Sequence, residues 1–115
     1  MSKRLEKLIA KAEVKGFARL NGRKRDYPYV GDLEEEYAVK IEDNIVTLRH
    51  WGTQTLRINT KNKEIIEVYG ESNSDRDSVN YVLRKFDMPY HVHYYPSRFE
   101  FELHENETDE ILEVI

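Results

Sequence analysis

Residues 37–86, YAVKIEDNIVTLRHWGTQTLRINTKNKEIIEVYGESNSDRDSVNYVLRKF, decide the fold of this chain. From 37 to 69, four runs alternate apolar and polar side chains at period two, which is typical of strands with one covered face. Between 79 and 86 the apolar residues recur instead at i, i+3, i+4 and i+7, the spacing of one helix face. This change of period predicts two β-hairpins followed by an amphipathic helix.

The alternation also predicts which side chains of the two hairpins face the core. Because only one face of the four strands is apolar, an antiparallel sheet with one face covered is the simplest arrangement. The cover is a helix from Ser74 to Phe86, whose start has Ser74 and Asp77 at the spacing of a capping box. The predicted inward-facing side chains are Tyr37, Val39, Ile41, Val46, Leu48, His50, Leu56, Ile58, Ile66 and Val68.

The N-terminal segment adds a second helix. Apolar residues at positions 5, 8, 9 and 12 form one narrow helical stripe, and Gly16 follows as the expected C-cap. The narrow stripe predicts a helix on the surface of the domain. The fold class is therefore predicted to be α+β, an antiparallel sheet of four to six strands covered on one face by an amphipathic helix, with an additional N-terminal helix.

A length of 115 residues fits a single domain. Residues 17–36 are predicted to form a loop, because Asn21-Gly22 and Tyr27-Pro28-Tyr29 are turn signals. The acidic end of the chain is expected to form a short helix or to fray. The predicted divisions are an N-terminal helix at 1–16, a basic and aromatic loop at 17–36, a sheet-and-helix core at 37–105 and an acidic tail at 106–115.

Composition restricts the class of protein. A hydrophobic content of 39% is too high for a disordered chain, and no apolar run approaches the roughly 20 residues that cross a bilayer. The absence of cysteine excludes disulfides, thiolate zinc sites and cysteine nucleophiles. No apolar secretory segment follows the charged start, so we expect a cytoplasmic protein without a membrane partner.

The net charge of −4 is unevenly distributed. Lys and Arg dominate residues 1–26, whereas residues 99–115 contain acidic side chains and neither Lys nor Arg. The two regions either attract each other or form two surfaces, one for an anionic and one for a cationic partner.

Within residues 17–36, a basic cluster lies next to tyrosines. Such side chains bind phosphates and stack on bases in single-strand binders. The alternative is a solvated loop whose positive charges face the glutamates at 34–36. The candidate nucleic-acid-binding residues are Arg19, Arg23, Lys24, Arg25 and Tyr27.

Residues 90–103 are predicted to form a further hairpin. They contain the only pattern in the sequence that offers side chains suited to binding a metal. Assuming a tight turn at Pro96-Ser97, His93 pairs with Glu100, and His91 pairs with Glu102. Imidazole nitrogens and carboxylate oxygens on one face are possible metal ligands. The alternative, which we favour, is two imidazole–carboxylate pairs on a wet surface, each stabilising the hairpin by at most about 1 kcal/mol. The sequence thus predicts neither a metal nor another cofactor.

The sequence does not predict an enzyme. It contains no Gly-x-Ser-x-Gly elbow, no phosphate-binding Gly-rich loop and no dinucleotide fingerprint. His50 is either a general base or, as we favour, a histidine at the edge of the core bonded to backbone.

The outward face of the sheet, with Lys40, Arg49 and Arg57, either binds single strands or forms cross-strand ion pairs with Glu42 and Glu67. We favour the ion pairs.

The stretch that runs from Leu48-Arg49-His50-Trp51-Gly52-Thr53 to Glu71-Ser72-Asn73-Ser74-Asp75-Arg76-Asp77, about a third of the chain, resembles small uncharacterised proteins of Gram-positive bacteria and their phages. The resemblance implies a non-catalytic accessory protein of phage or mobile-element type that binds a macromolecular partner, expected to be another protein. It carries no activity over to any residue. The alternative function is nucleic-acid binding by the basic segment Arg19–Tyr29.

Overall fold

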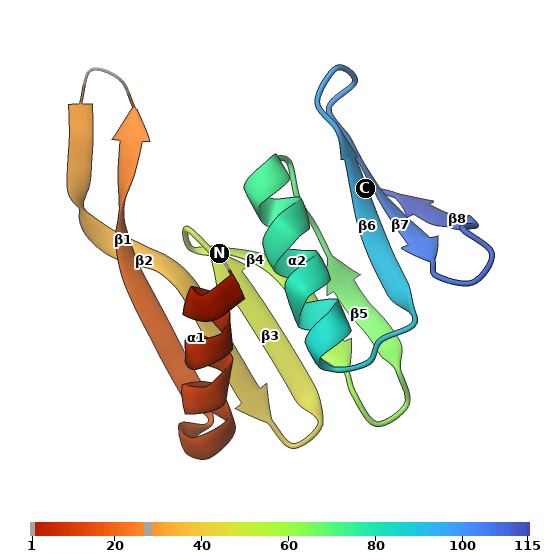
Figure 1. The fold of residues 1–115 in the computed structure, drawn as a ribbon, viewed down its shortest axis with the longest axis horizontal. Helices are drawn as coiled ribbons and strands as arrows, with labels where there is room; N and C mark the ends of the chain where they lie inside the picture. The colour runs from red at the N-terminus through yellow and green to blue at the C-terminus, as the bar shows by residue number, and fades with distance from the viewer. Residues whose placement is uncertain (1, 27–28) are drawn as a thin grey trace.

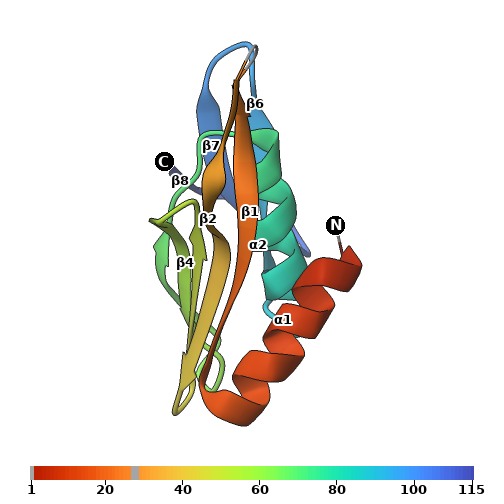
Figure 2. The same ribbon diagram turned by 90° about the vertical axis from the view of Figure 1, so that its left-hand side faces the viewer.

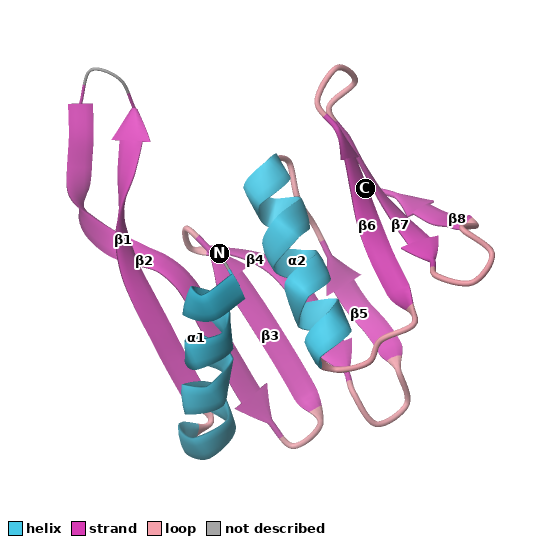
Figure 3. Ribbon diagram, viewed as in Figure 1, coloured by secondary structure: helices cyan, strands magenta, loops and turns pink. Residues whose placement is uncertain are grey.

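The computed structural model describes residues 2–26 and 29–115, and the side chains of residues 3–23 and 33–115. It is an α+β fold with two antiparallel sheets and two helices (Figures 1 and 3). One sheet has five strands in the order β1-β2-β3-β4-β5, and the other has three in the order β6-β7-β8. The elements are α1 (Ser2–Lys15), β1 (Phe17–Asp26), β2 (Tyr29–Glu42), β3 (Ile45–His50), β4 (Thr53–Asn59), β5 (Glu64–Val68), α2 (Asn73–Lys85), β6 (Tyr90–Tyr95), β7 (Glu100–Glu105) and β8 (Ile111–Val114).

Both helices lie on the same face of the five-stranded sheet, and its other face is uncovered (Figure 2). The core forms between these layers and includes the predicted strand residues Val39, Leu48 and Ile58 together with Val79 and Leu83 of α2. The predicted fold class and the covering role of the second helix are thus confirmed. Among the predicted inward-facing residues, Ile66 is wrong: it is exposed at a register shift between β4 and β5, and Ile65 packs on the core instead.

The apolar stripe of helix α1 belongs to the core, and the other side of the helix is exposed on the surface of the domain. Every apolar residue of its stripe is buried: Leu5, Leu8, Ile9 and Ala12. The stripe is narrow, but β1 and β2 extend the sheet beneath it and supply Ala18 and Tyr37 as apolar neighbours in the same cluster. The predicted C-cap is confirmed. Gly16 has a φ of +81°, which a glycine adopts without strain, and its amide donates to the carbonyl of Ala12.

Residues 17–36, predicted as a loop, instead form most of the β1–β2 hairpin. Asn21-Gly22 is a point at which the register of the two strands shifts, not a turn. The prediction failed because exposed basic side chains interrupt the apolar alternation without disturbing the backbone ladder, whose hydrogen bonds do not depend on side-chain polarity.

Helix α2 begins earlier than predicted. Its N-cap is Ser72, whose hydroxyl accepts a hydrogen bond from the Asp75 amide at 3.1 Å, so the predicted start at Ser74 is two residues late. Both serines have an aspartate three residues later, and the capping pattern cannot distinguish them. The Asp75 side chain decides the start, because it is also bonded to His50 and to the Glu71 amide.

The second sheet lies beside α2 and is joined to the rest of the fold by apolar packing, to which Val92 and Leu103 contribute, and by specific contacts (Figure 1). The Asn80 amide of α2 bonds both backbone groups of Val92, at 2.8 and 3.0 Å, as a neighbouring strand would. The ring of Phe101 covers Gly70, where a Cβ atom would overlap it.

The acidic tail, predicted to be a short helix or frayed, contains strand β8. Neither helix of the described chain is long and apolar enough to cross a membrane.

Candidate metal centre

Strands β6 and β7 pair in a different register from the predicted one. His93 lies opposite Glu102, and His91 lies opposite His104. The predicted two-residue turn at Pro96-Ser97 is instead the four-residue connection 96–99 between Tyr95 and Glu100, closed by a hydrogen bond from the Arg98 amide to the Tyr95 carbonyl. The longer connection shifts every cross-strand pair by two residues. The same side chains stay on each face, but a third imidazole, that of His104, now lies beside His91 and His93.

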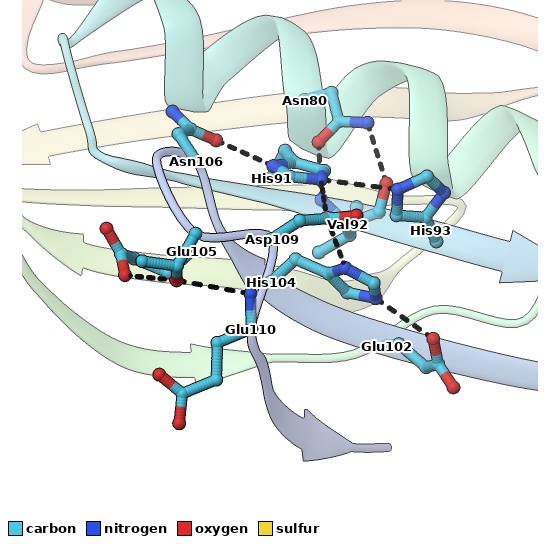
Figure 4. Close-up of polar contacts among 11 residues, drawn as sticks. Asn80, His91, Val92, His93, Glu102, His104, Glu105, Asn106, Asp109 and Glu110 are labelled. Atoms are coloured by element: carbon cyan, nitrogen blue, oxygen red, sulfur yellow. Dashed lines mark hydrogen bonds and ion pairs between the residues drawn. The ribbon is translucent and has the colours of Figure 1, made fainter.

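Four side chains converge on this face: His91, His93, His104 and Asp109. One nitrogen of each imidazole and one carboxylate oxygen lie within 4.8 Å of one another. Strand β6 supplies two of the imidazoles, β7 supplies the third, and the connection from β7 to β8 supplies the carboxylate. Figure 4 shows Asp109 between His91 and His104.

Three of the distances within this group are given by direct contacts. His91 Nε2 lies 3.2 Å from His93 Nε2 and 3.3 Å from Asp109 Oδ1. The same carboxylate oxygen lies 2.8 Å from His104 Nδ1. Ligand atoms bonded tetrahedrally to zinc at about 2.0–2.1 Å are separated by about 3.3 Å. The spacing in the cluster is therefore close to that of a tetrahedral site with three nitrogen ligands and one oxygen ligand.

Two further groups orient the imidazoles from outside the cluster. His91 Nδ1 donates to Asn106 Oδ1 at 2.6 Å, which leaves the Nε2 lone pair directed at the cluster. His104 Nε2 donates to the buried carboxylate of Glu102 at 2.9 Å, so its Nδ1 is the nitrogen that faces Asp109. Histidine ligands in metalloproteins are usually held in this way, with the remote N–H donated to a carboxylate or a carbonyl group.

The electrostatics divide the cluster into a cationic and a neutral part. Burial alone would lower the pKa of His104, but its hydrogen bonds to Glu102 and Asp109 outweigh burial and raise that pKa. Burial, followed by repulsion from His104 and His91, lowers the pKa of His93. The hydrogen bond with His104 is the main cause of the lowered pKa of Asp109. The two carboxylates therefore favour the protonated form of His104, whose Nδ1 must lose its proton to bind a metal, whereas the lowered pKa of His93 favours its neutral form.

The wet surface favoured for these four side chains is wrong for Glu102, which is buried, as is His104 beside it. Four metal ligands were candidates from the sequence. His91 and His93 are in the cluster, and Glu102 lies outside it but is hydrogen-bonded to His104. Glu100 does not take part, because it lies opposite Tyr95 and pairs with Arg98 at 3.2 Å. The alternating pattern of β7 already placed His104 on the face of Glu102, but Asp109 had no periodic signal because it lies in a turn.

The candidate nucleic-acid residues lie on the β1–β2 hairpin. Arg19 and Arg23 are exposed on β1, the side chains of Lys24 and Arg25 are outside the described part of the chain, and Tyr27 lies outside the described residues. Two of the glutamates expected to face this cluster pair elsewhere. Glu35 pairs with Arg49, and Glu36 pairs with Arg4.

His50 is bonded to a carboxylate and not, as favoured, to backbone. Its Nδ1 donates to Asp75 Oδ1 at 2.7 Å, and the ring stacks on Tyr37 with centroids 4.4 Å apart. Burial alone would raise the pKa of Asp75, but the hydrogen bonds from His50 and the Glu71 amide outweigh it and lower that pKa. Burial is the main cause that raises the pKa of Tyr37 to about 12. The group connects β2 and β3 to the start of α2, which is a structural role.

No family model, curated protein or solved structure matches this chain.

Proposed function

We propose that this protein binds a divalent transition-metal ion, Zn²⁺, through His91, His93, His104 and Asp109. The observation that carries the proposal is the convergence of three imidazole nitrogens and one carboxylate oxygen within 4.8 Å. The outer hydrogen bonds to Asn106 and Glu102 support it, because they direct the remaining nitrogens of two imidazoles into the cluster.

The chemistry of the donor set favours zinc. Imidazole and carboxylate ligands without thiolate suit Zn²⁺, whereas Mg²⁺ and Ca²⁺ prefer oxygen ligands alone. Four protein ligands fill a tetrahedral zinc site and leave no position for substrate, which is typical of a structural centre. Its effect would be to connect β6, β7 and the β7–β8 connection.

The test is metal uptake by the purified protein, measured by titration calorimetry with Zn²⁺ and by elemental analysis after dialysis. We expect one Zn²⁺ per chain, and at least a hundredfold weaker binding by a His91→Ala, His93→Ala double variant. Glu100→Gln is the matched control, because it alters the same hairpin outside the cluster and should bind Zn²⁺ normally. Equal uptake by the double variant and the wild type would disprove the site. With Co²⁺ in place of Zn²⁺, the intense visible absorption of tetrahedral coordination should appear.

A second candidate function is binding of another protein, as expected of an accessory protein of phage or mobile-element type. It is supported by β8, an edge strand on which Ile111, Leu112 and Val114 are 53, 47 and 58% exposed. Exposed edges of this kind pair with strands of other chains. A tagged pull-down with nuclease treatment tests it: a stoichiometric protein partner should be retained by the wild type and lost by Leu112→Lys. A partner retained by both would place the interface elsewhere.

A further inference from the structure

The uncovered face of the five-stranded sheet contains a hollow of about 440 Å³. Both helices lie on the opposite face, so neither of them covers this side (Figure 2). The hollow forms around Ala38, whose small side chain lies among longer ones. Its lining includes Phe17, three cations and two acids: Lys40, Arg49, Arg57, Glu42 and Asp43.

The strand register places four cations on two adjacent rows across the sheet. In one row, Arg19 of β1 and Arg49 of β3 lie on either side of Ala38 of β2. In the next row, Phe17, Lys40, Thr47 and Arg57 follow one another on β1 to β4. Neighbouring strands are about 4.8 Å apart, so Lys40 and Arg57, two strands apart, are separated at their backbones by about 10 Å.

The cations of this face are only partly neutralised by the protein itself. Lys40 pairs with Glu42 at 3.2 Å, and Arg49 pairs with Glu35 at 3.0 Å. Arg57 is exposed and forms no ion pair with any residue that the structure describes. The lining of the hollow thus contains three cations and two acidic side chains, and Glu67 of β5 lies opposite Arg57, on a chain whose net charge is −4.

An exposed aromatic ring lies within this basic surface. Phe17 is 42% exposed, and the guanidinium group of Arg49 lies 5.9 Å from the centre of its ring. A large apolar ring with an accessible face is a stacking platform for an unpaired base, and guanidinium groups beside it bind the adjacent phosphates. A double helix conceals the faces of its bases, and the acidic side chains of a peptide have no ring to stack on Phe17. The combination favours a single strand over either.

We propose that the open face of the five-stranded sheet binds single-stranded nucleic acid, with phosphates on Lys40, Arg49 and Arg57 and a base on Phe17. Arg19 lies beyond Ala38 in the neighbouring row and extends the basic path toward the β1–β2 hairpin. This surface is separate from the metal centre, which is built on the other sheet. Binding should therefore be the same in Zn²⁺ and in EDTA, so the two proposals fail or succeed independently.

The test is fluorescence anisotropy of a fluorescein-labelled oligouridylate of about ten nucleotides, a length within the site sizes of single-strand binders. Phe17→Ala should weaken binding at least fivefold, and Arg57→Gln should weaken it and lower the slope of log K against log salt by about 0.7. The matched controls are Phe99→Ala, which removes an exposed ring from the β6–β7 connection, and Arg84→Gln, which removes a charge from the helical layer. Both should bind as the wild type does.

The proposal is overturned if the wild type does not bind at low salt, or if the two variants of the face behave as their controls do. The proposal is also overturned if Arg57→Gln weakens binding and Phe17→Ala does not, because the face would then attract any polyanion without stacking a base. A duplex of equal length should compete at least tenfold less well than the single strand. An oligodeoxythymidylate in the same assay shows whether the 2′-hydroxyl contributes. Thermal unfolding of each variant controls for loss of fold.

Discussion

The five-stranded and the three-stranded sheet are joined to the same helix but are stabilised by different contacts. The larger sheet presents a fully buried apolar face, with Leu48, Leu56 and Ile58 inaccessible to solvent. The smaller sheet also buries Phe101 and Leu103, yet its other face buries a carboxylate and an imidazole, Glu102 and His104. Its last strand, β8, is exposed along its entire length. Both sheets thus include a buried ionic contact, His50 with Asp75 in the larger one and His104 with Glu102 in the smaller one, but only in the smaller sheet do the buried charged groups lie on the face opposite the apolar one.

The largest expected effect on the free energy of unfolding is at the apolar face of the five-stranded sheet. Ile58→Ala removes a fully buried side chain between β4 and the helices, and should lower the free energy of unfolding by about 2–5 kcal/mol. Chemical denaturation followed by circular dichroism measures it. A loss below about 1 kcal/mol would mean that the helical layer does not pack as described.

Zinc should stabilise mainly the smaller sheet. At a free concentration of about 100 times its dissociation constant, a ligand specific for the folded state adds about 2.7 kcal/mol. We expect amide hydrogen exchange in β6 to β8 to slow on addition of Zn²⁺ and to recover in EDTA, while β3 and β4 change little. Equal protection of both sheets would show that the ion binds elsewhere or that the two sheets unfold together.

Asp75→Asn tests the ionic contact that belongs to the larger sheet. The change weakens the buried hydrogen bond to His50, which involves a charged group, and should cost about 2 kcal/mol at neutral pH. The folded-state pKa of Asp75 is lowered, so its contribution is complete above the ordinary value of 3.8 and disappears as the pH falls through the folded-state pKa. The difference between variant and wild type, measured by urea unfolding across this range, should therefore shrink on acidification. If the difference in unfolding free energy between the variant and the wild type did not change with pH, the substitution would act through packing.

Gly70→Ala tests the junction between the sheets. A Cβ at this position meets the Phe101 ring, which is itself buried and cannot move freely, so overpacking should cost about 1–3 kcal/mol. The double variant with Phe101→Leu should recover part of the loss. No recovery would locate the strain in the backbone.

The smallest effect is expected at β8. Leu112→Ala removes a side chain that is 47% exposed and should change the free energy of unfolding by less than about 0.5 kcal/mol. The same denaturation assay compares it with Ile58→Ala. A larger loss would mean that β8 is covered in solution, for example by a second chain.

The sequence by itself determined most of the first sheet and both helices. Strands from Tyr37 to Val68, the helix over residues 74–85 and the cap at Gly16 agree with the structure, because period and capping are local properties of the chain. In β1, Ala18 and Leu20 lie on the covered face and Phe17 and Arg19 on the other, but an apolar residue on each face and the basic residues that follow conceal the period of the strand.

Only the tertiary structure decided the candidate metal centre. His91 and His93 could be identified in advance because they share one strand face, whereas their partners depend on the β6–β7 register. A connection of two or of four residues keeps the same faces together, so alternation cannot choose between them. The four-residue connection places His104 opposite His91, and the turn before β8 brings Asp109 to both. Contacts between residues distant in sequence depend on connection lengths, for which periodicity carries no signal.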